Sequence, residues 1–429
     1  MALRNILLLL FLPVWLFPLY GWAQVTGCTD PQATNFNAQA TQNDGNCLYP
    51  ETAYRLLPKV SPLPEVIRET SGLAFDGTRL WTHNDSGHSN TLYALDTLSG
   101  QVRQTVTVSN ATNIDWEDLA FDGTFLYVGD FGNNAGNRRD LAIYKIRLSD
   151  IGSAATVSVP SEKISFSYPD QTDFASAPLN TSFDCEAFFF HRNLLHLFTK
   201  NWRTKHTSHY TVPTGAGPQV ASLVETFPAN GLITGADITA TGEIALIGYD
   251  NTGSAPTFLW LLFDYPDNLF FGGNKRRIEL GSALEAGQIE GITFRQGASG
   301  YISSERFTVS GILVQPAKLY AFQFGQWLTR TRTGLAPDSP EEKSVTVWPN
   351  PFQNEFVLKV PEWPRATEST IQIIDSTGKA VPPTAYEVTA EPGIFRINFT
   401  QSSLAPGVYL LTVSANGKNE KRKFKLMKI

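Results

Sequence analysis

Short apolar stretches with a period of two recur along residues 51–330, separated by turns rich in Asp, Asn and Gly. This alternation predicts β-strands. Five units begin with the segments SGLAF (71–75), EDLAF (117–121), EAFFF (186–190), ADITA (236–240) and EGITF (290–294). Each unit continues with a tight turn, a second strand and, in most units, two more. Four antiparallel strands repeated five times predict an all-β fold, a five-bladed β-propeller.

The two ends of this repeat complement each other. The fifth unit lacks a fourth strand, whereas AYRLLPKV (53–60) precedes the first unit and has no unit to join. We therefore expect residues 53–60 to complete the last blade and close the ring. The second unit is longer than the others, which indicates an insertion within 160–182. A sixth blade in that insertion is the alternative.

The N-terminus has the pattern of an export signal. Arg4 precedes an apolar run over 6–20, and small residues follow at Gly21 and Ala23, so residues 1–23 are predicted to be a secretory signal peptide. A lipoprotein signal ending at Cys28 is disfavoured because the apolar run stops too early. No later run reaches the ~20 residues of a spanning helix, so no transmembrane segment is expected.

Residues 24–50 form a polar segment bracketed by Cys28 and Cys47. In an oxidising compartment a disulfide between them would contribute roughly 3 kcal/mol to a segment with no core of its own. The segment resembles short modules of secreted proteins from Bacteroidetes over residues 27–49. Asp30 and Asp44 are possible calcium ligands there, but a disulfide-closed spacer is the favoured interpretation.

The C-terminal residues 344–429 alternate with a period of two and contain turn signals at 376–379 and 416–418. They predict a small immunoglobulin-like β-sandwich, preceded by a linker at 331–343. The segment resembles the C-terminal sorting domain of the type IX secretion system at 349–351 (PNP), 375–378, 407–409 and 421–429. The resemblance implies interaction with that secretion machinery. It also implies export through the periplasm of a Gram-negative bacterium, followed by release or attachment at the cell surface.

Composition narrows the function classes. Hydrophobic residues make up 42% and charged residues 17% of the chain, which excludes disorder and a coiled coil. The net charge of −6 provides no basic surface for binding nucleic acid. This charge divides into +3 over residues 344–429 and −9 over the rest of the chain. The acidic part would suit a divalent cation as a ligand. The chain contains no HExxH, GxSxG or P-loop motif, so the zinc peptidase, serine hydrolase and nucleotide-fold classes lose support.

The candidate metal site comes from the starts of the inner strands. First strands line the centre of a propeller, so their first residues should gather at one face. Glutamates converging there would raise each other's pKa values unless a cation neutralised them, and calcium suits such oxygen ligands. Acceptance of backbone N–H bonds by Glu117 and Glu186 is the alternative. The predicted ligands are Ser71, Glu117, Glu186, Thr234 (with Ala236 as the alternative) and Glu290.

The order of these residues resembles five-bladed calcium-dependent nucleotidases of the apyrase type, which place Ser, Glu, Glu, Ser and Glu around one calcium. That resemblance implies a calcium-dependent hydrolase of phosphate esters or anhydrides. The fourth position departs from the pattern, and the residues that hold the nucleotide have no counterpart. The segments SGLAF, LWTHNDSG and TGADIT are similar to a group of secreted bacterial propellers without an assigned function.

A second series of polar residues ends the second strands and should share the same face. Arg138 and Lys200 could steer an anionic phosphate or carboxylate toward the metal, with ordinary salt bridging as the alternative. His83 is a possible general base or a structural histidine. A non-catalytic module that binds a glycan or a protein through Trp81, Trp116 and Trp202 is the competing function. The candidate catalytic residues are His83, Asp85, Asp130, Arg138, Lys200 and Glu305.

Overall fold

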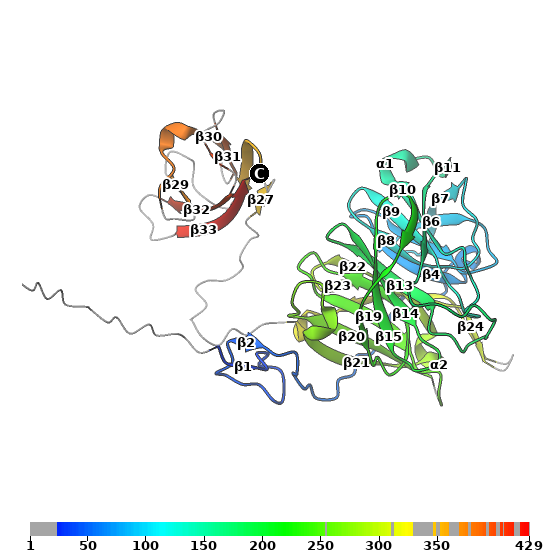
Figure 1. Ribbon diagram of the computed structural model, residues 1–429. Helices are drawn as coiled ribbons and strands as arrows, with labels where there is room; N and C mark the ends of the chain where they lie inside the picture. Colours follow the sequence, from blue (N-terminus) through cyan, green and yellow to red (C-terminus); the bar gives the residue numbers. More distant parts are fainter. Residues whose placement is uncertain are drawn as a thin grey trace, which may run out of the picture. The chain divides into compact units, whose positions relative to one another are not determined.

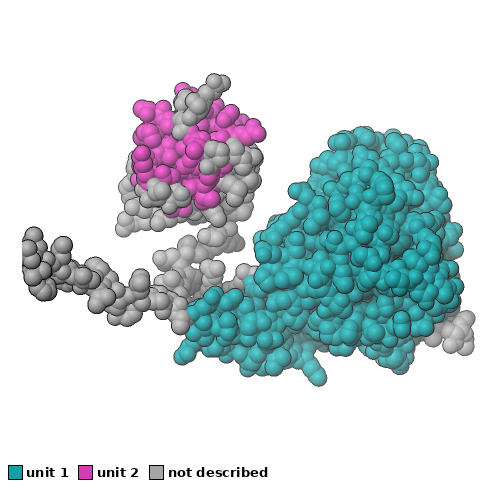
Figure 2. Space-filling model, viewed as in Figure 1, with its two compact units in different colours: residues 1–332 teal, residues 333–429 magenta. Residues whose placement is uncertain are grey.

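The computed structural model describes residues 24–253, 255–309, 313–328, 346–348, 352–359, 369–375, 379–391, 394–399, 404–405, 407–415 and 421–428. The chain divides into two compact units, residues 1–332 and 333–429 (Figure 2). The signal peptide expected at 1–23 and the linker expected at 331–343 lie outside the described residues.

Regular structure in the described ranges is almost entirely β, which confirms the predicted all-β class. No helix in these ranges is long and apolar enough to cross a membrane. The helical elements are single turns: α1 (Leu148–Ile151), α2 (Ala283–Ala286), η1 (Glu65–Ile67), η2 (Phe270–Gly272), η3 (Gly325–Trp327) and η5 (Pro383–Ala385).

The described residues of the first unit contain five sheets of four or five strands, numbered here 1 to 5 in chain order (Figure 1). From the first strand outward, sheet 1 contains β4 (Thr70–Phe75), β5 (Leu80–Asn84), β6 (Thr91–Leu95), β7 (Val102–Val108) and β11 (Thr156–Val159). Sheet 2 contains β8 (Trp116–Phe121), β9 (Phe125–Asp130), β10 (Ala142–Arg147), β12 (Glu162–Ser167) and β16 (Gly217–Val220).

The remaining sheets have four strands each. Sheet 3 contains β13 (Asp184–His191), β14 (Leu194–Lys200), β15 (Thr207–Pro213) and β17 (Ser222–Phe227). Sheet 4 contains β18 (Leu232–Ile238), β19 (Ile244–Tyr249), β20 (Pro256–Phe263) and β21 (Asn274–Ser282). Sheet 5 contains β22 (Gln288–Gln296), β23 (Ser299–Glu305), β26 (Lys318–Gln323) and β3 (Pro58–Val60).

The first strands of the five sheets contact one another in sequence. β4 packs beside β8, β8 beside β13, β13 beside β18 and β18 beside β22, and β22 returns to β4. The outermost strand of sheet 5 is β3, which pairs antiparallel with β26 in the register Leu319 to Val60. This pairing confirms for residues 58–60 the expectation that the segment before the first unit completes the last sheet, whereas Ala53 bridges to Glu279 of sheet 4 instead.

Two outer strands were not predicted. β11 pairs with β7 and β16 pairs with β12, both in parallel, so segments from later in the chain extend sheets 1 and 2. Residues 160–182, all described, contain only the strand β12, which belongs to sheet 2. The insertion therefore holds no additional sheet. Two small ladders complete the unit: β1 (Thr26–Gly27) with β2 (Gln42–Asn43), and β24 (Phe307–Val309) with β25 (Leu313–Gln315).

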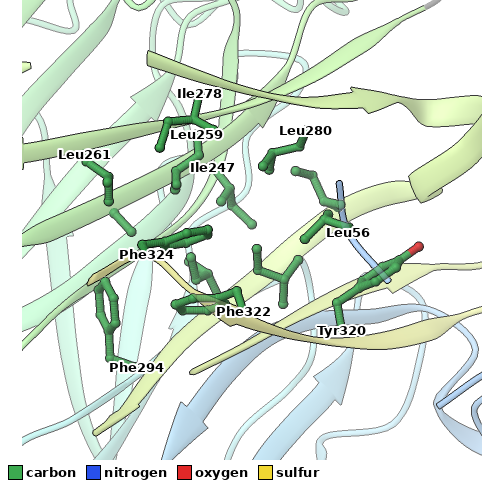
Figure 3. Packing of buried hydrophobic residues seen from close by; sticks show 14 of the residues in the cluster. Leu56, Ile247, Leu259, Leu261, Ile278, Leu280, Phe294, Tyr320, Phe322 and Phe324 are labelled. Carbon is green, nitrogen blue, oxygen red and sulfur yellow. The ribbon is translucent and has the colours of Figure 1, made fainter. Parts of the chain in front are cut away.

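The core lies between neighbouring sheets, because alternate residues of each strand face the next sheet. Figure 3 shows the cluster between sheets 4 and 5, where Ile247 and Leu259 pack with Phe322 and Phe324. Leu56, from the segment before β3, joins the same cluster and ties the start of the chain to the last sheet. Burial of apolar surface stabilises such contacts by roughly 25 cal/mol per Å².

The N-terminal segment is closed by the predicted disulfide between Cys28 and Cys47. It is not a detached spacer, because it docks on sheet 4. The Asn43 side chain donates to the side chain of Asn274 at 2.9 Å, and the Lys275 ammonium donates to the backbone oxygen of Gly45 at 2.9 Å.

The second unit contains two antiparallel sheets that share one hydrophobic cluster. Phe356 and Ile397 come from one sheet, and Ile373 and Leu411 come from the other. This arrangement agrees with the two-layer packing expected from the sequence. The strands are β27 (Thr346–Trp348), β28 (Glu355–Lys359), β31 (Ile394–Phe399) and β30 (Tyr386–Glu391), then β29 (Ser369–Asp375), β32 (Gly407–Ala415) and β33 (Lys421–Lys428).

Candidate functional site

Every first strand has a β-bulge near its start. The ladder register slips between residues 70 and 73, 116 and 119, 185 and 187, 233 and 235, and 289 and 291. Bulges redirect side chains and often occur beside functional sites. The residues within these five irregularities include all five predicted metal ligands, Ser71, Glu117, Glu186, Thr234 and Glu290, which we call the bulge ring. Thr234, rather than Ala236, occupies the fourth position.

The two hydroxyl residues of the bulge ring link neighbouring sheets. Ser71 donates from its hydroxyl to the backbone oxygen of Glu117 at 2.6 Å, and Thr234 donates to the backbone oxygen of Ile289 at 2.8 Å. Each bond runs from one first strand to the next. A Cβ at Gly72, which follows Ser71, would overlap the backbone of Asp118, so only glycine permits this approach.

The three glutamates of the bulge ring are buried, with exposures of 3–5%. Glu117 has no hydrogen bond or ion pair from its carboxylate among the described residues. Burial, followed by the neighbouring carboxylates of Glu186, Asp85 and Asp115, raises the pKa of Glu117 well above its ordinary value. A buried carboxylate without donors is costly unless a cation is supplied.

Asp85 and Asp115 lie beside Glu117. One carboxylate oxygen from each of the three residues lies within 4.8 Å of the other two. Burial, followed by repulsion from Asp85 and Asp184, raises the pKa of Asp115 to about 7. Asp115 was missed by sequence reasoning, although it stands only two residues before Glu117, directly before β8.

Lys200 meets Glu186. Its ammonium contacts both carboxylate oxygens, at 2.6 and 2.5 Å, and the two side chains are each 5% exposed. Burial disfavours the ammonium, but the contact with Glu186 outweighs it and raises the pKa of Lys200. The Trp202 and Tyr249 rings lie 4.9 and 5.4 Å from the ammonium. Lys200 therefore neutralises a carboxylate, and its charge is not free to steer an anion.

Glu290 and Glu305 stand on the facing strands of sheet 5. The side-chain amide of Gln288 donates to Glu290 at 2.6 Å, and the backbone of Gln288 lies opposite Glu305 in the ladder. Burial raises the pKa of Glu290 to about 7. Burial and the nearby Glu290 raise the pKa of Glu305 to about 9. This sheet adds two more carboxyl groups to the acidic region.

Asp130 and Arg138 form a second buried ion pair, at 3.0 Å. Arg138 also donates to Asp140 at 3.1 Å and to the backbone oxygen of Gly132 at 2.8 Å. Its guanidinium is thus engaged by the protein itself. These contacts match the salt-bridging alternative for Arg138.

His83 is fully buried. Its Nδ1–H donates to the backbone oxygen of Asn84 at 2.9 Å, and its ring packs edge-on against Trp116. Burial lowers the pKa of His83 to about 4. The contacts are those of a structural histidine. Trp81 and Trp116 are also 0% exposed, so neither can contact an external glycan, whereas Trp202 is partly exposed and donates to Asp184 at 2.7 Å.

The backbone N–H bonds that were considered for Glu117 and Glu186 are made instead by Asp118 and Asp237. Asp118 accepts from the backbone N–H groups of Phe188 at 3.1 Å and Ala236 at 3.4 Å, and so joins three first strands. Asp237 accepts from Phe294 at 2.7 Å. Sequence reasoning missed both, because the bulges shift which of two adjacent residues faces the neighbouring strand.

The solved structures that resemble this chain do so weakly. PorZ, a surface component of the type IX secretion system of Porphyromonas gingivalis, matches at 13% identity and TM-score 0.31, over 84% of this chain and 45% of its own, so this chain spans less than half of PorZ. An exo-β-1,3-galactanase from Phanerochaete chrysosporium matches at 10% identity and TM-score 0.38, over 90% and 92%. PhoX from Pseudomonas fluorescens matches at 11% identity and TM-score 0.31, over 54% and 57%.

No curated protein matches the sequence. Residues 346–427 match the family model of the secretion system C-terminal sorting domain, in agreement with the resemblance seen at 349–351 and 421–429. A domain of this family interacts with the type IX secretion machinery. The C-terminal unit is therefore a type IX sorting domain, and the protein is exported to the bacterial cell surface.

Proposed function

We propose that this exported protein is a calcium-binding five-bladed β-propeller, with the ion at the face where the bulge ring lies. The five sheets, the cyclic contacts of their first strands and the completion of sheet 5 by β3 support the blade count. The five-fold recurrence of the bulge supports the equivalence of the five sheets as blades.

The observation that carries the proposal is the Glu117 carboxylate. It is 4% exposed, has no donor among the described residues, and lies against the carboxylates of Asp85 and Asp115. Three carboxylates in this arrangement repel one another in the absence of a cation. The two cationic side chains expected at this face are used elsewhere, since Lys200 pairs with Glu186 and Arg138 pairs with Asp130.

The donor set fits calcium. Carboxylate oxygens are hard ligands, and calcium accepts six to eight oxygens with flexible geometry and is completed by water. Asp85, Asp115 and Glu117 could supply up to six oxygens. Cys185, the free cysteine of the described residues, is buried and bonds through its sulfur to the backbone oxygen of Phe198, so no thiolate would favour a softer metal.

The contacts favour binding over hydrolysis. Calcium-assisted hydrolysis of a phosphate ester would need a free cation beside the metal to hold the anion. Lys200 and Arg138, the residues expected to do this, are both neutralised by carboxylates. The function supported best is therefore that of a calcium-stabilised surface module. Hydrolysis is the second candidate, and an activity screen tests it.

Thermal unfolding of the full chain, with calcium and with chelator, tests the proposal. Calcium at about 100 times its Kd should add about 2.7 kcal/mol to the free energy of unfolding. The E117Q variant should lose this increment, whereas the control variant E162Q, at an exposed glutamate of sheet 2, should keep it. Equal melting temperatures in calcium and chelator would refute the metal. Turnover of nucleotides or phosphate esters with calcium would establish hydrolysis instead.

A further inference from the structure

The glutamates of the bulge ring, with the side chains that they face, fall into two groups with different partners. Glu186 has the Lys200 ammonium, and Glu290 has the amide of Gln288. Glu117 has neither, and it faces Asp85 and Asp115. The bulge ring is therefore not five equivalent ligands around one centre, because its negative charge is left uncompensated on the side of sheets 1 and 2.

The second group is assembled from two sheets. Asp85 follows the end of β5 in sheet 1, and its backbone N–H donates to Glu69 at 3.0 Å. Asp115 precedes β8 in sheet 2, and its backbone N–H donates to the Asp130 carboxylate at 3.1 Å. Asn113 holds the two sheets together here, because its amide donates to the backbone oxygen of Asp85 at 2.9 Å. The carboxylates are thus carried by an anchored backbone.

Gly132 lies directly against the carboxylates of Glu117 and Asp115. A Cβ at this position would overlap Oε1 of Glu117 and a carboxylate oxygen of Asp115. Gly132 cannot retreat easily, since its N–H donates to the backbone oxygen of Asp115 at 3.2 Å and its oxygen accepts from Arg138 at 2.8 Å. A glycine fixed on both sides lets two carboxylates lie against the backbone where any side chain would displace them, an observation that is independent of their charge.

We infer that one divalent cation binds to Asp85, Asp115 and Glu117 against Gly132, and that Lys200 takes the place of a cation at Glu186. The inference deepens the proposed calcium function and rests on it. It assigns the ligands to the interface of sheets 1 and 2, and it replaces four of the five ligands expected from the sequence. Glu290 and Thr234 then serve the packing of the first strands rather than the metal.

The assignment predicts one calcium per chain. D115N and G132A should each weaken calcium binding on the order of 100-fold, since D115N removes a charged ligand and the Cβ of G132A would displace the Glu117 and Asp115 carboxylates. E290Q is the matched control, because Glu290 is equally buried and its amide replacement is isosteric; it should bind calcium as the natural chain does. E186Q alone would leave Lys200 unpaired, so the double variant E186Q/K200Q tests that group, and it should also retain binding.

Isothermal titration of the full chain and these variants with calcium chloride decides the matter. One site in the natural chain, lost in D115N and G132A and kept in E290Q and E186Q/K200Q, supports the inference. Calcium binding that survives D115N and G132A but disappears in E290Q or E186Q/K200Q overturns it and leaves the proposed function standing. No binding by the natural chain refutes the proposed function itself.

Discussion

Lys200 and Glu186 form an ion pair at the base of sheet 3 in which the ammonium contacts both carboxylate oxygens, and each side chain is 5% exposed. Lys200 ends β14, and Glu186 sits in the bulge of β13 beside it. Lys200, which the sequence suggested would face an external anion, is thus the internal counterion of Glu186, which the sequence suggested would bind a metal.

Replacing Lys200 with Met should be strongly destabilising. The change leaves the Glu186 carboxylate buried and unpaired, which costs about 3–5 kcal/mol in the free energy of unfolding. The more exposed pair of Arg103 and Asp96 is the control, and R103M should cost far less because solvent screens an exposed ion pair. Denaturant unfolding measures both, and equal costs would contradict the importance of the buried pair.

Substitutions of Glu117 and Asp118, which are neighbours in β8, should change the free energy of unfolding differently when calcium is removed by a chelator. E117Q removes a buried carboxylate that has no donor, so it should leave stability unchanged or raise it. D118N replaces the carboxylate that accepts hydrogen bonds from the backbone N–H groups of Phe188 and Ala236 with a neutral amide. It should lower the free energy of unfolding by at least about 2 kcal/mol. Chemical unfolding of both variants without calcium makes the comparison. A large loss in E117Q would mean that Glu117 has a structural partner.

The strand pattern made much of the first unit predictable. Alternation located four of the five first strands within two residues, as at 71–75 against the observed Thr70–Phe75, whereas the strand expected at 236–240 is Leu232–Ile238. Of the orphan segment 53–60, Pro58–Val60 joins sheet 5 as expected, but Ala53 bridges to Glu279 in sheet 4. The parallel outer strands β11 and β16 were missed, because their partners β7 and β12 are about 50 residues away and an edge pairing leaves no local pattern.

The candidate site was predictable in position but not in partners. The five residues of the bulge ring were identified because each occupies an equivalent position near the start of the first strand of its repeated unit. Lys200 lies opposite Asp184 in the ladder and forms its ion pair with Glu186, two residues further along β13. The spacing of 14 residues between Glu186 and Lys200 is compatible with this contact, but spacing alone does not identify which charged side chains pair. The role of Asp118 depends on the bulge itself, which period-two reasoning cannot place.

Asp76 should set part of the acid sensitivity of sheet 1. Burial opposes its ionisation, but hydrogen bonds from Arg79, Trp81 and Thr78 outweigh this and lower the pKa of Asp76 to about 2. Because the folded pKa is depressed, the stabilisation is present above the unfolded pKa of ~3.9 and is lost as pH falls toward 2.

The comparison that checks this is the unfolding free energy of D76N against the natural chain over this pH range. The natural chain should be more stable at neutral pH, and the difference should shrink between pH about 4 and about 2. D150N, at an exposed aspartate, should show no such convergence. A difference that stays constant with pH would contradict the role of the Asp76 carboxylate.

Lys275 should hold the N-terminal module on sheet 4. Its ammonium donates to the backbone oxygens of Gly45, Phe271 and Gly273 at 2.9, 2.9 and 2.7 Å. K275M removes all three bonds, so the segment after Cys47 should open more often and be cut faster by chymotrypsin near the exposed Leu48.

Mass spectrometry of the released fragment measures this rate, because a cut there frees the disulfide-closed segment. K145M is the matched control, since Lys145 of β10 in sheet 2 donates to the backbone oxygen of Thr214, between β15 and β16, and not to the module. Identical cleavage rates in K275M and the natural chain would show that the other contacts suffice to dock the module.

The most direct test of the central claim is anomalous X-ray scattering from crystals of the full chain grown with calcium. The account predicts one calcium peak at about 2.3–2.6 Å from carboxylate oxygens of Asp85, Asp115 and Glu117. The Lys200 contact with Glu186 should remain intact in the same crystal. An anomalous map with no peak at these residues, or with a peak coordinated by Glu186 and Glu290 in place of Lys200, would contradict it.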